Sequence, residues 1–466
     1  MKLVVLGGGP AGYVAALRAA QLGAQAVLVE AREIGGTCLN RGCIPTKSLV
    51  AGVDRLRQAR GAAAFGVEVG EVRVDFAALM RRKEEVVAQQ RAGVEHLLKA
   101  RKVEVVLGRG RLVGPRRLRV APIAGGGDDA LGEPLEIEGD ALVLASGSEP
   151  VRLPIFDFSD PCVYTSDELL GIDHIPDSML VVGGGVIGCE FAAVFATLGT
   201  RVTIVEMLEQ LLPGEDKRTG QTLRQAFKRA AIEVRLKTKV EEVLSSDERG
   251  ITVRLSDGQE LTTAVALVGV GRRAVSEGLG YEEAGVALDR GFVVADDTLR
   301  TPVAGVFAAG DLAGPPLLAH WAYYEGALAA ENAVTGSRLT VDRRVVPNCV
   351  FSHPEVASCG LTEDRAAAEG IEIDVAHFRF NANAKAVIEG EADGYVRIVS
   401  ERGAGTVLGA TMVGPRVTEL IHEIALAATA RLTLADVMAT IHAHPTLSEA
   451  VGEAALSGGG RAMHGL

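Results

Sequence analysis

Two cysteines near the N-terminus have the residue type and the spacing for redox chemistry. The stretch "GGTCLNRGCIPTK" places Cys38 and Cys43 five positions apart, and they are two of only six cysteines in the 466-residue chain. In a regular helix their Cα atoms would lie about 8.6 Å apart, whereas a disulfide needs about 5.5 Å. The pair therefore requires a break in the helix, which Gly42 and Pro45 would permit. A redox disulfide, a zinc site and a pair of inert buried thiols are the competing interpretations.

Composition limits what these thiols can do. Six cysteines in a chain this long do not make a disulfide scaffold, so we expect a cytoplasmic, reducing compartment in which a disulfide is catalytic. A structural zinc ion would need a second pair of Cys or His ligands, which is missing, so no metal is expected. The net charge of −12 argues against nucleic acid. No apolar run approaches the roughly 20 residues of a membrane span, so no membrane is expected as a partner.

The elements that position the thiols come from an internal repeat. The segments "KLVVLGGGPAGYVAALRAAQLGAQAVLVE" and "MLVVGGGVIGCEFAAVFATLGTRVTIVE" each predict a strand, a glycine-rich turn, a helix and a second strand ending in an acid. Each acid follows the third glycine of a GxGxxG turn by 18 positions (30 − 12 and 206 − 188). The first set is Gly7, Gly9, Gly12 and Glu30, and the second set is Gly183, Gly185, Gly188 and Glu206. Two dinucleotide-binding βαβ units are therefore predicted.

The two units differ in what they reveal about their cofactors. The glycines of such a turn permit a tight bend, a close approach to a pyrophosphate and close helix packing, and the acid accepts from ribose hydroxyls. In the second unit, "VEMLEQLLP" follows Glu206 with Glu209 and no Arg or Lys, which predicts NAD rather than NADP. The first turn could hold FAD or NAD. Cys38 and Cys43 lie only a few residues beyond its second strand and thus near its ligand.

These features together resemble the pyridine nucleotide-disulfide oxidoreductases. The resemblance rests on "GGTCLNRGCIPTK", the two fingerprints, "VFAAGDL" and "HAHPTLSE", which follow the family's order over essentially the whole chain. It implies FAD in the first site, NAD in the second, and a Cys38–Cys43 redox disulfide between the flavin and a dithiol substrate. The members most similar oxidise protein-bound dihydrolipoamide with NAD. The implied partners are thus a lipoyl domain, of a 2-oxo acid dehydrogenase or glycine cleavage complex, and a second copy of the chain in a homodimer.

The resemblance also assigns roles to individual residues. Cys38 would exchange with substrate, and Cys43 would lie on the flavin side, where its thiolate can make a charge-transfer contact. Lys47 would lie beside the flavin N5 and be held by Glu190. Asp311 matches the acid at the ribityl and phosphate part of FAD. The remaining predicted cofactor contacts are Gly36, Thr37, Gly110 (at the adenine), Gly147, Ala319 and His320 (at the flavin pyrimidine), Val240, Gly271 and Arg272.

Thiol–disulfide exchange needs a base that takes a proton from the attacking thiol, and histidine suits this task near neutral pH. His444 is the candidate, because the family places its base immediately before the proline, here Pro445. Glu449 would orient the imidazole and stabilise its charged form. His442 is interpreted as structural. The resemblance further implies that each active site takes its thiols from one subunit and His444 with Glu449 from the other.

The predicted fold class is α/β: two Rossmann-like dinucleotide-binding domains, for FAD and NAD, plus a C-terminal α+β dimerisation domain. The predicted boundaries are 1–150 and 277–345 for the FAD domain, 151–276 for the NAD domain and 346–466 for the interface domain. "GYVRIVS" predicts a strand of the last domain and "VTELIHEIALAATA" a helix. "FAALMRRKEEVVAQQRAGVEHLLKA" predicts a helix that packs one face on a core, and "APIAGGGDDALGEP" a mobile surface loop.

Departures from the family pattern leave other interpretations to weigh. "AHWAYYEG" carries Trp321, Tyr323 and Tyr324 where the family commonly has a lysine and acids. Glutathione-type reductases would want NADPH-binding arginines after Glu206. Mercuric reductases and larger thioredoxin reductases carry a C-terminal thiol pair, whereas the last cysteine here is Cys359. The alternatives are another disulfide reductase of the family that uses NADH or NADPH, and a non-catalytic flavin-bearing redox sensor, against which the set of thiols, histidine and acid argues.

Overall fold

The computed structural model describes residues 1–123, 133–247 and 250–464. The chain divides into two compact units, each made of three segments. The first unit is Met1–Leu49, Asp75–Val151 and Gly271–Val341, and the second is Val50–Val74, Arg152–Val270 and Asp342–Leu466. Residues 124–132 of the predicted surface loop lie outside the described residues. Within the described ranges, no helix is both long and apolar enough to span a membrane.

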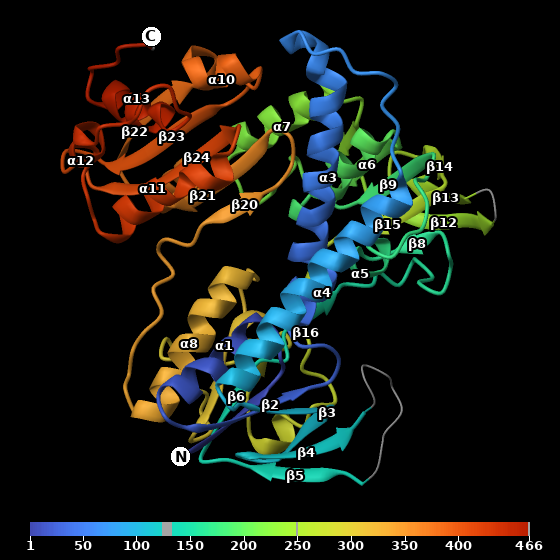
Figure 1. Cartoon of the computed structure of the whole chain (residues 1–466), viewed down its shortest axis with the longest axis vertical. Coiled ribbons are helices and arrows are strands. Elements are labelled where there is room, and N and C mark those ends of the chain that lie inside the picture. Colours follow the sequence, from blue (N-terminus) through green and yellow to red (C-terminus); the bar gives the residue numbers. More distant parts are fainter. Residues whose placement is uncertain (124–132, 248–249, 465–466) are drawn as a thin grey trace. The chain divides into compact units, whose positions relative to one another are not determined.

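A seven-stranded sheet forms the centre of the first unit, in the order β19-β6-β1-β2-β3-β4-β5. Figure 1 labels its strands β6, β2, β3, β4 and β5. Its parallel part consists of β19 (Val306–Ala308), β6 (Ala141–Leu144), β1 (Lys2–Leu6), β2 (Gln25–Glu30) and the start of β3 (Glu104–Gly114). The strands β4 (Arg117–Pro122) and β5 (Leu135–Glu138) continue it antiparallel. The central strands are almost continuous buried runs of Val, Leu and Ala, which is typical of a sheet covered on both faces.

Helices of the first unit arise from the segments that flank this sheet. α1 (Pro10–Gln21) joins β1 to β2, which confirms the first predicted βαβ unit, and α8 (Ala319–Thr335) packs along α1. α4 (Phe76–Ala100) confirms the predicted helix, begins at the N-cap Asp75 and contacts α1, α2 (Gly36–Arg41) and β3. The short strands β7 (Ser148–Pro150) and β16 (Arg272–Ala274) pair with each other and join two of the unit's segments. η3 (Gly310–Ala313) follows β19, and β17 (Leu288–Asp289) pairs with β18 (Phe292–Val293).

The second βαβ repeat lies in the second unit. Its parallel sheet has the order β11-β10-β9-β15-β8, from β11 (Glu233–Leu236), β10 (Arg201–Glu206), β9 (Ser178–Val182), β15 (Val265–Val268) and β8 (Val163–Tyr164). α6 (Val186–Leu198) joins β9 to β10 as predicted, and α7 (Lys217–Arg229) precedes β11. An antiparallel sheet of β12 (Val240–Asp247), β13 (Gly250–Leu255) and β14 (Glu260–Thr263) packs beside it, and α5 (Ser166–Leu169) follows β8.

The C-terminal part of the second unit is an antiparallel sheet in the order β20-β21-β24-β23-β22. These strands are β20 (Asn348–Val350), β21 (Glu355–Gly360), β24 (Val407–Gly414), β23 (Tyr395–Glu401) and β22 (Ile373–Arg379). The predicted strand "GYVRIVS" is β23, and the predicted helix near 417–430 is α11 (Val417–Thr429). α11 and α13 (Glu449–Gly458) bury their apolar faces with this sheet. The shorter helices are α9 (Glu363–Glu369), α10 (Ala384–Glu389) and α12 (Leu434–Ala439).

Candidate active site

The two glycine-rich turns have nearly the same geometry in the two units. At the first glycine of each turn, Gly7 and Gly183, φ is +106°, and a Cβ would lie 2.2 Å from the Ala145 carbonyl oxygen or 2.5 Å from that of Gly269. At the third glycine of each turn, a Cβ would lie 1.7 Å from the oxygen of the first glycine in the first unit and 2.0 Å in the second. These positions therefore require glycine because the neighbouring backbone is too close for a side chain.

The second glycine of each turn faces space instead of backbone. A Cβ at Gly185 would meet nothing within 4 Å, and the nearest atom to one at Gly9 would be the Cα of Gly36 at 3.8 Å. Both residues are helix N-caps without a side-chain cap, so the first amides of α1 and α6 are not bound by a capping side chain. Open space in front of a helix N-terminus fits a pyrophosphate. Both turns thus fit a dinucleotide.

The acid after each turn is held by the backbone of that turn. Glu30 accepts hydrogen bonds from the amides of Gly8 (2.5 Å) and Arg32 (2.7 Å), and burial raises its pKa despite these bonds. Glu206 accepts from Gly184 (2.6 Å) and Leu208 (2.7 Å) in the same way. A carboxylate has about four lone-pair sites, so each acid keeps acceptor capacity for a ribose hydroxyl pair.

The thiol pair lies against the first turn, and its backbone breaks as the spacing predicts. Gly36, the first residue of α2, has φ +59°, and a Cβ on it would lie 2.5 Å from the Cα of Gly9. α2 carries Cys38 and ends at Gly42, whose φ of −145° and ψ of −107° are not helical, and Cys43 starts α3 (Cys43–Gly61). This break confirms the predicted departure from a regular helix. It brings the two cysteines, both free thiols in this structure, close enough to interact.

The surroundings of Cys38 disfavour its thiolate. The hydrogen bond with Cys43, and then burial, raise the pKa of Cys38 far above its usual value, while the ammonium of Lys47 and the hydroxyl of Tyr323 act in the opposite direction. The order of the two thiols, with Cys38 exchanging with substrate and Cys43 on the flavin side, stays a prediction from the family pattern.

Several predicted FAD contacts meet around Ser148, a residue that the sequence reasoning missed. The Ser148 hydroxyl donates to Asp311, and the Arg272 guanidinium donates to the Ser148 hydroxyl (2.8 Å) and carbonyl oxygen (2.7 Å). Gly147, immediately before Ser148, has φ +74°. Ser148 could have been suspected because it follows Gly147, a predicted cofactor contact. The sequence around it does not indicate, however, that β7 pairs with β16. Asp311, Gly147 and Arg272 therefore form one group in the first unit.

The other predicted residues lie apart from that group or in the second unit. Thr37 follows Gly36 in α2, and Ala319 and His320 open α8. Gly110, on β3, is buried against the side chains of Leu6 and Val29, and Gly271 has φ +122° before β16. Val240 begins β12 in the second unit. Glu190, on α6, is 3% exposed and accepts from the Phe351 amide at 3.0 Å, so its predicted pairing with Lys47 joins residues of two different units and stays a prediction.

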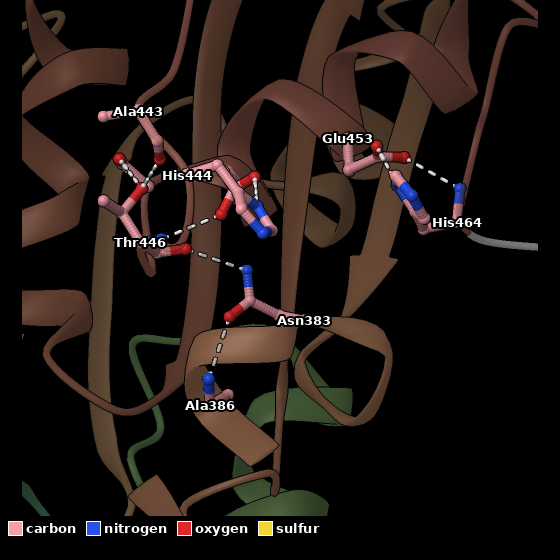
Figure 2. A network of polar contacts seen from close by, with 9 residues as sticks. Asn383, Ala386, Ala443, His444, Thr446, Glu453 and His464 are labelled. Atoms are coloured by element: carbon pink, nitrogen blue, oxygen red, sulfur yellow. Dashed lines mark hydrogen bonds and ion pairs between the residues drawn. The ribbon is translucent and has the colours of Figure 1, made fainter. Parts of the chain in front are cut away.

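The predicted histidine and acid are in direct contact. Nδ1 of His444 lies 2.9 Å from Oε1 of Glu449, whose other oxygen accepts from the Thr446 amide at 2.8 Å. Figure 2 shows His444 and Thr446 in this network. Asn383 donates to the Thr446 carbonyl oxygen (3.1 Å) and caps α10 through Ala386. Burial alone would raise the pKa of Glu449, but the bonds from Thr446 and His444 outweigh it and hold the pKa below its usual value. An ionised Glu449 only accepts, so Nδ1 of His444 donates and Nε2 is left as a base.

The chain was compared with protein families, with known sequences and with solved structures, and all three comparisons found relatives. Residues 1–326 match the family described as pyridine nucleotide-disulphide oxidoreductase, and residues 346–455 match its dimerisation domain. Dihydrolipoyl dehydrogenase of Bacillus subtilis is 39% identical over 99% of this chain and 98% of its own, and that of Halobacterium salinarum is 41% identical over 100% and 97%. A crystal structure of LpdA from Mycobacterium tuberculosis superposes with a TM-score of 0.90 at 30% identity, covering 98% of this chain and 99% of that one.

Proposed function

Because the chain belongs to the pyridine nucleotide-disulphide oxidoreductase family, we propose that it oxidises protein-bound dihydrolipoamide to lipoamide, with FAD as bound cofactor and NAD as electron acceptor. The observation that carries this proposal is the contact between Cys38 and Cys43 beside the first nucleotide turn. The full-length similarity to dihydrolipoyl dehydrogenases supports the choice of substrate. The acid at the second turn, Glu206, supports NAD over NADP.

The first exchange step consumes the Cys38–Cys43 disulfide. Nε2 of His444 takes the proton from one substrate thiol, and the thiolate attacks the sulfur of Cys38. The bond between Cys38 and Cys43 breaks, and Cys43 leaves as a thiolate with the electron pair of that bond. Glu449 accepts from Nδ1 and stabilises the imidazolium that forms.

The second exchange step releases the product. The remaining substrate thiol loses its proton, which the leaving Cys38 sulfur takes up, and its own sulfur attacks the substrate sulfur that is bonded to Cys38. The mixed disulfide breaks, the lipoamide ring closes, and Cys38 leaves with the electron pair. The substrate has then lost two electrons and the thiol pair has gained them. When bound, FAD supplies two-electron transfer between a reduced thiol pair and a nicotinamide.

The assembly and the domain boundaries are part of the same proposal. We propose a cytoplasmic homodimer in which the thiols of one subunit face His444 and Glu449 of the other. Its substrate carrier would be the lipoyl domain of a 2-oxo acid dehydrogenase or glycine cleavage complex. The dimerisation domain at residues 346–455 supports the dimer. We further propose FAD-binding segments at 1–150 and 277–345, an NAD domain at 151–276 and an interface domain at 346–466.

One pair of assays tests the proposed reaction. We expect purified, yellow protein to reduce NAD with dihydrolipoamide, and to do so far faster than it oxidises NADPH with glutathione disulfide. The second assay is the control for another disulfide reductase of the family. A protein that binds FAD but turns over neither substrate pair would support the redox-sensor alternative, and faster turnover of NADPH with glutathione disulfide would refute the choice of substrate.

A further inference from the structure

The side chain of His442 anchors the segment that carries the base His444. Of the five residues 441–445, His442 alone is not exposed. Its side chain is 10% exposed, whereas Ile441 is 97% exposed and the side chain of His444 is 73% exposed. The His442 ring packs on α13, where a Cβ at Gly452 would lie 2.7 Å from Nδ1. Within its own subunit, the part of the chain just before His444 is therefore held through one largely buried ring.

Both ring nitrogens of His442 face hydrogen-bond acceptors. Nε2 lies 3.0 Å from Oε1 of Glu423 on α11, and Nδ1 lies 3.1 Å from the carbonyl oxygen of Thr440. A backbone carbonyl only accepts, and so does an ionised carboxylate. A neutral imidazole has a single N–H and would satisfy one of these two acceptors. The geometry therefore fits an imidazolium, which donates from both nitrogens.

We propose that His442 is a positioning residue for the base His444 and that it acts as an imidazolium held by Glu423. With both protons present, the ring ties the segment before His444 to α11 and closes the turn to Thr440. When one proton is lost, a nitrogen lone pair faces an acceptor, that bond breaks, and the segment is released. The inference rests on the proposed function for the reaction that His444 serves, but the contacts of His442 do not depend on it.

The groups that face His442 from the neighbouring helices favour its charged form. The hydrogen bond with Glu423 on α11 raises the pKa of His442 most, burial acts against it, and the negative charges of Glu423 and of Glu449 on α13 add to the increase, as does the Thr440 carbonyl. Both hydrogen bonds are thus present at low pH and are lost as pH rises through this raised pKa. His444 must be neutral to take a proton, so we expect turnover to rise as His444 deprotonates and to fall as His442 does.

The first experiment measures kcat/KM for dihydrolipoamide, with NAD as acceptor, from about pH 5.5 to about pH 9.5 in wild type and in Glu423→Gln. Glutamine keeps the size of the side chain and a carbonyl acceptor but removes the charge, so His442 loses its proton at lower pH. The alkaline limb of the profile should move to lower pH. Near pH 7.5, kcat/KM should fall by about 3- to 10-fold, the range of one lost hydrogen bond, and the two proteins should agree at the acid end. An alkaline limb that stays in place would overturn the proposal.

The double variant separates this role from a general loss of packing. His442→Gln has no charge to lose at this position, so kcat/KM should be about 3- to 10-fold lower even at the acid end, and the limb that belongs to His442 should disappear. Adding Glu423→Gln to His442→Gln should then change the profile no further, because the carboxylate has no imidazolium to hold. Losses that simply add at every pH would show that Glu423 does not act through His442, and would refute the proposal.

A second carboxylate–histidine pair of the same domain supplies the matched control. Oε1 of Glu453, on α13, lies 2.7 Å from Nδ1 of His464, away from the segment that carries His444. Glu453→Gln makes the same chemical change as Glu423→Gln and should leave both limbs of the profile in place. Flavin absorbance and the thermal unfolding midpoint show whether each variant is folded. An equal shift of the alkaline limb in Glu453→Gln would refute the assignment of that limb to His442.

The protonation of His442 is measured directly by deuterium exchange at C2 of its imidazole. The exchange is followed against pH by mass spectrometry of FAD-loaded protein, with fragment ions that separate His442 from His444. The wild-type midpoint should lie above about pH 6.5, the ordinary value for histidine, and Glu423→Gln should lower it. An ordinary or lower midpoint in wild type would overturn the imidazolium, and a shifted midpoint beside an unchanged rate profile would refute the positioning role. Wild-type protein that does not oxidise dihydrolipoamide would instead refute the proposed function, while the exchange would still decide the charge of His442.

Discussion

Replacing Glu449 by glutamine should damage the enzyme at least as much as replacing it by alanine. The two oxygens of Glu449 have separate tasks, since one accepts from Nδ1 of His444 at 2.9 Å and the other from the Thr446 amide at 2.8 Å. Glutamine has a single carbonyl oxygen, so it satisfies one of these donors at most. Which donor it satisfies determines the proton position on the imidazole.

Both orientations of the new amide are unfavourable. If its oxygen stays with Thr446, its NH₂ group faces Nδ1 of His444, which must then be the acceptor, and the imidazole proton moves to Nε2. His444 can then no longer take a proton at Nε2. If the oxygen faces His444, the NH₂ group meets the Thr446 amide, and two donors face each other. Alanine removes both bonds but leaves the imidazole free to adopt either tautomer.

The size of the expected loss of activity in each variant follows from the contacts of Glu449. The bond between ionised Glu449 and an imidazolium is charge-assisted and is worth about 1.5–3 kcal/mol. His444 is 73% exposed, and solvent screening places the value at the low end of that range. Glu449→Ala should therefore reduce kcat by about 10-fold, since each 1.36 kcal/mol is a factor of ten. Glu449→Gln should cost about 10²- to 10⁴-fold, the range for a wrongly protonated or missing base.

The assay is NAD reduction by dihydrolipoamide, with flavin content and thermal unfolding measured for each variant. Glu453→Gln is the matched control because Glu453 lies on the same helix, one turn later, and also bonds a histidine, His464, at 2.7 Å (Figure 2). That pair has no part in the proposed reaction, so kcat should stay near wild type. Wild-type turnover by folded Glu449→Gln protein would refute the assignment of the base.

Three further predictions test the rest of the site. Glu206→Gln should improve kcat/KM for NADP relative to NAD by about 10-fold, because an uncharged amide no longer repels a 2′-phosphate, and unchanged selectivity would show that Glu206 is not at the ribose. A hydrogen bond to Glu423 raises the pKa of His442, so its stabilisation is present below about pH 6.5 and lost as pH rises through the folded pKa. His442→Gln should thus lower the thermal midpoint more at pH 6 than at pH 9, and equal shifts at both pH values would contradict this. Mixed dimers of Cys38→Ser and His444→Ala subunits, isolated with two tags, should regain one working site in two, and activity no higher than either parent would place base and thiols in one subunit.

The parts of the site that the sequence predicts are those that depend on local backbone geometry. The GxGxxG spacing, the acid 18 positions later and the break between Cys38 and Cys43 each follow from what a short stretch of chain can do. All three are present in the structure. The contact of His444 with Glu449 lies in the same class, because the two residues are only five positions apart, with His444 just before α13 and Glu449 at its start.

The contacts that could not be predicted from the sequence depend on which helices and strands pack together. Tyr323 is separated from Tyr13 by about three hundred positions, and their rings lie 5.9 Å apart where Gly326 lets α8 approach α1. Ser148 joins Arg272 because β7 pairs with β16 across a long insertion. Neither pairing has a periodic signal, so a tyrosine in an unusual segment could be noticed but not assigned.

The chain segments that follow the two acids explain why one turn would keep its dinucleotide and the other exchange it. After Glu30, the Gly35 amide returns to the carbonyl oxygen of Gly8 at 2.8 Å, and Gly36 then places α2 and its thiol against Gly9. After Glu206, the Leu212 amide makes the equivalent bond to Gly184 at 2.8 Å, but among the described residues of the second unit a Cβ at Gly185 would meet nothing within 4 Å. The first turn thus has protein on its ligand side, as a resident flavin next to a thiol pair requires. Within the second unit the equivalent position has no such cover, which is compatible with a nicotinamide that leaves after each turnover.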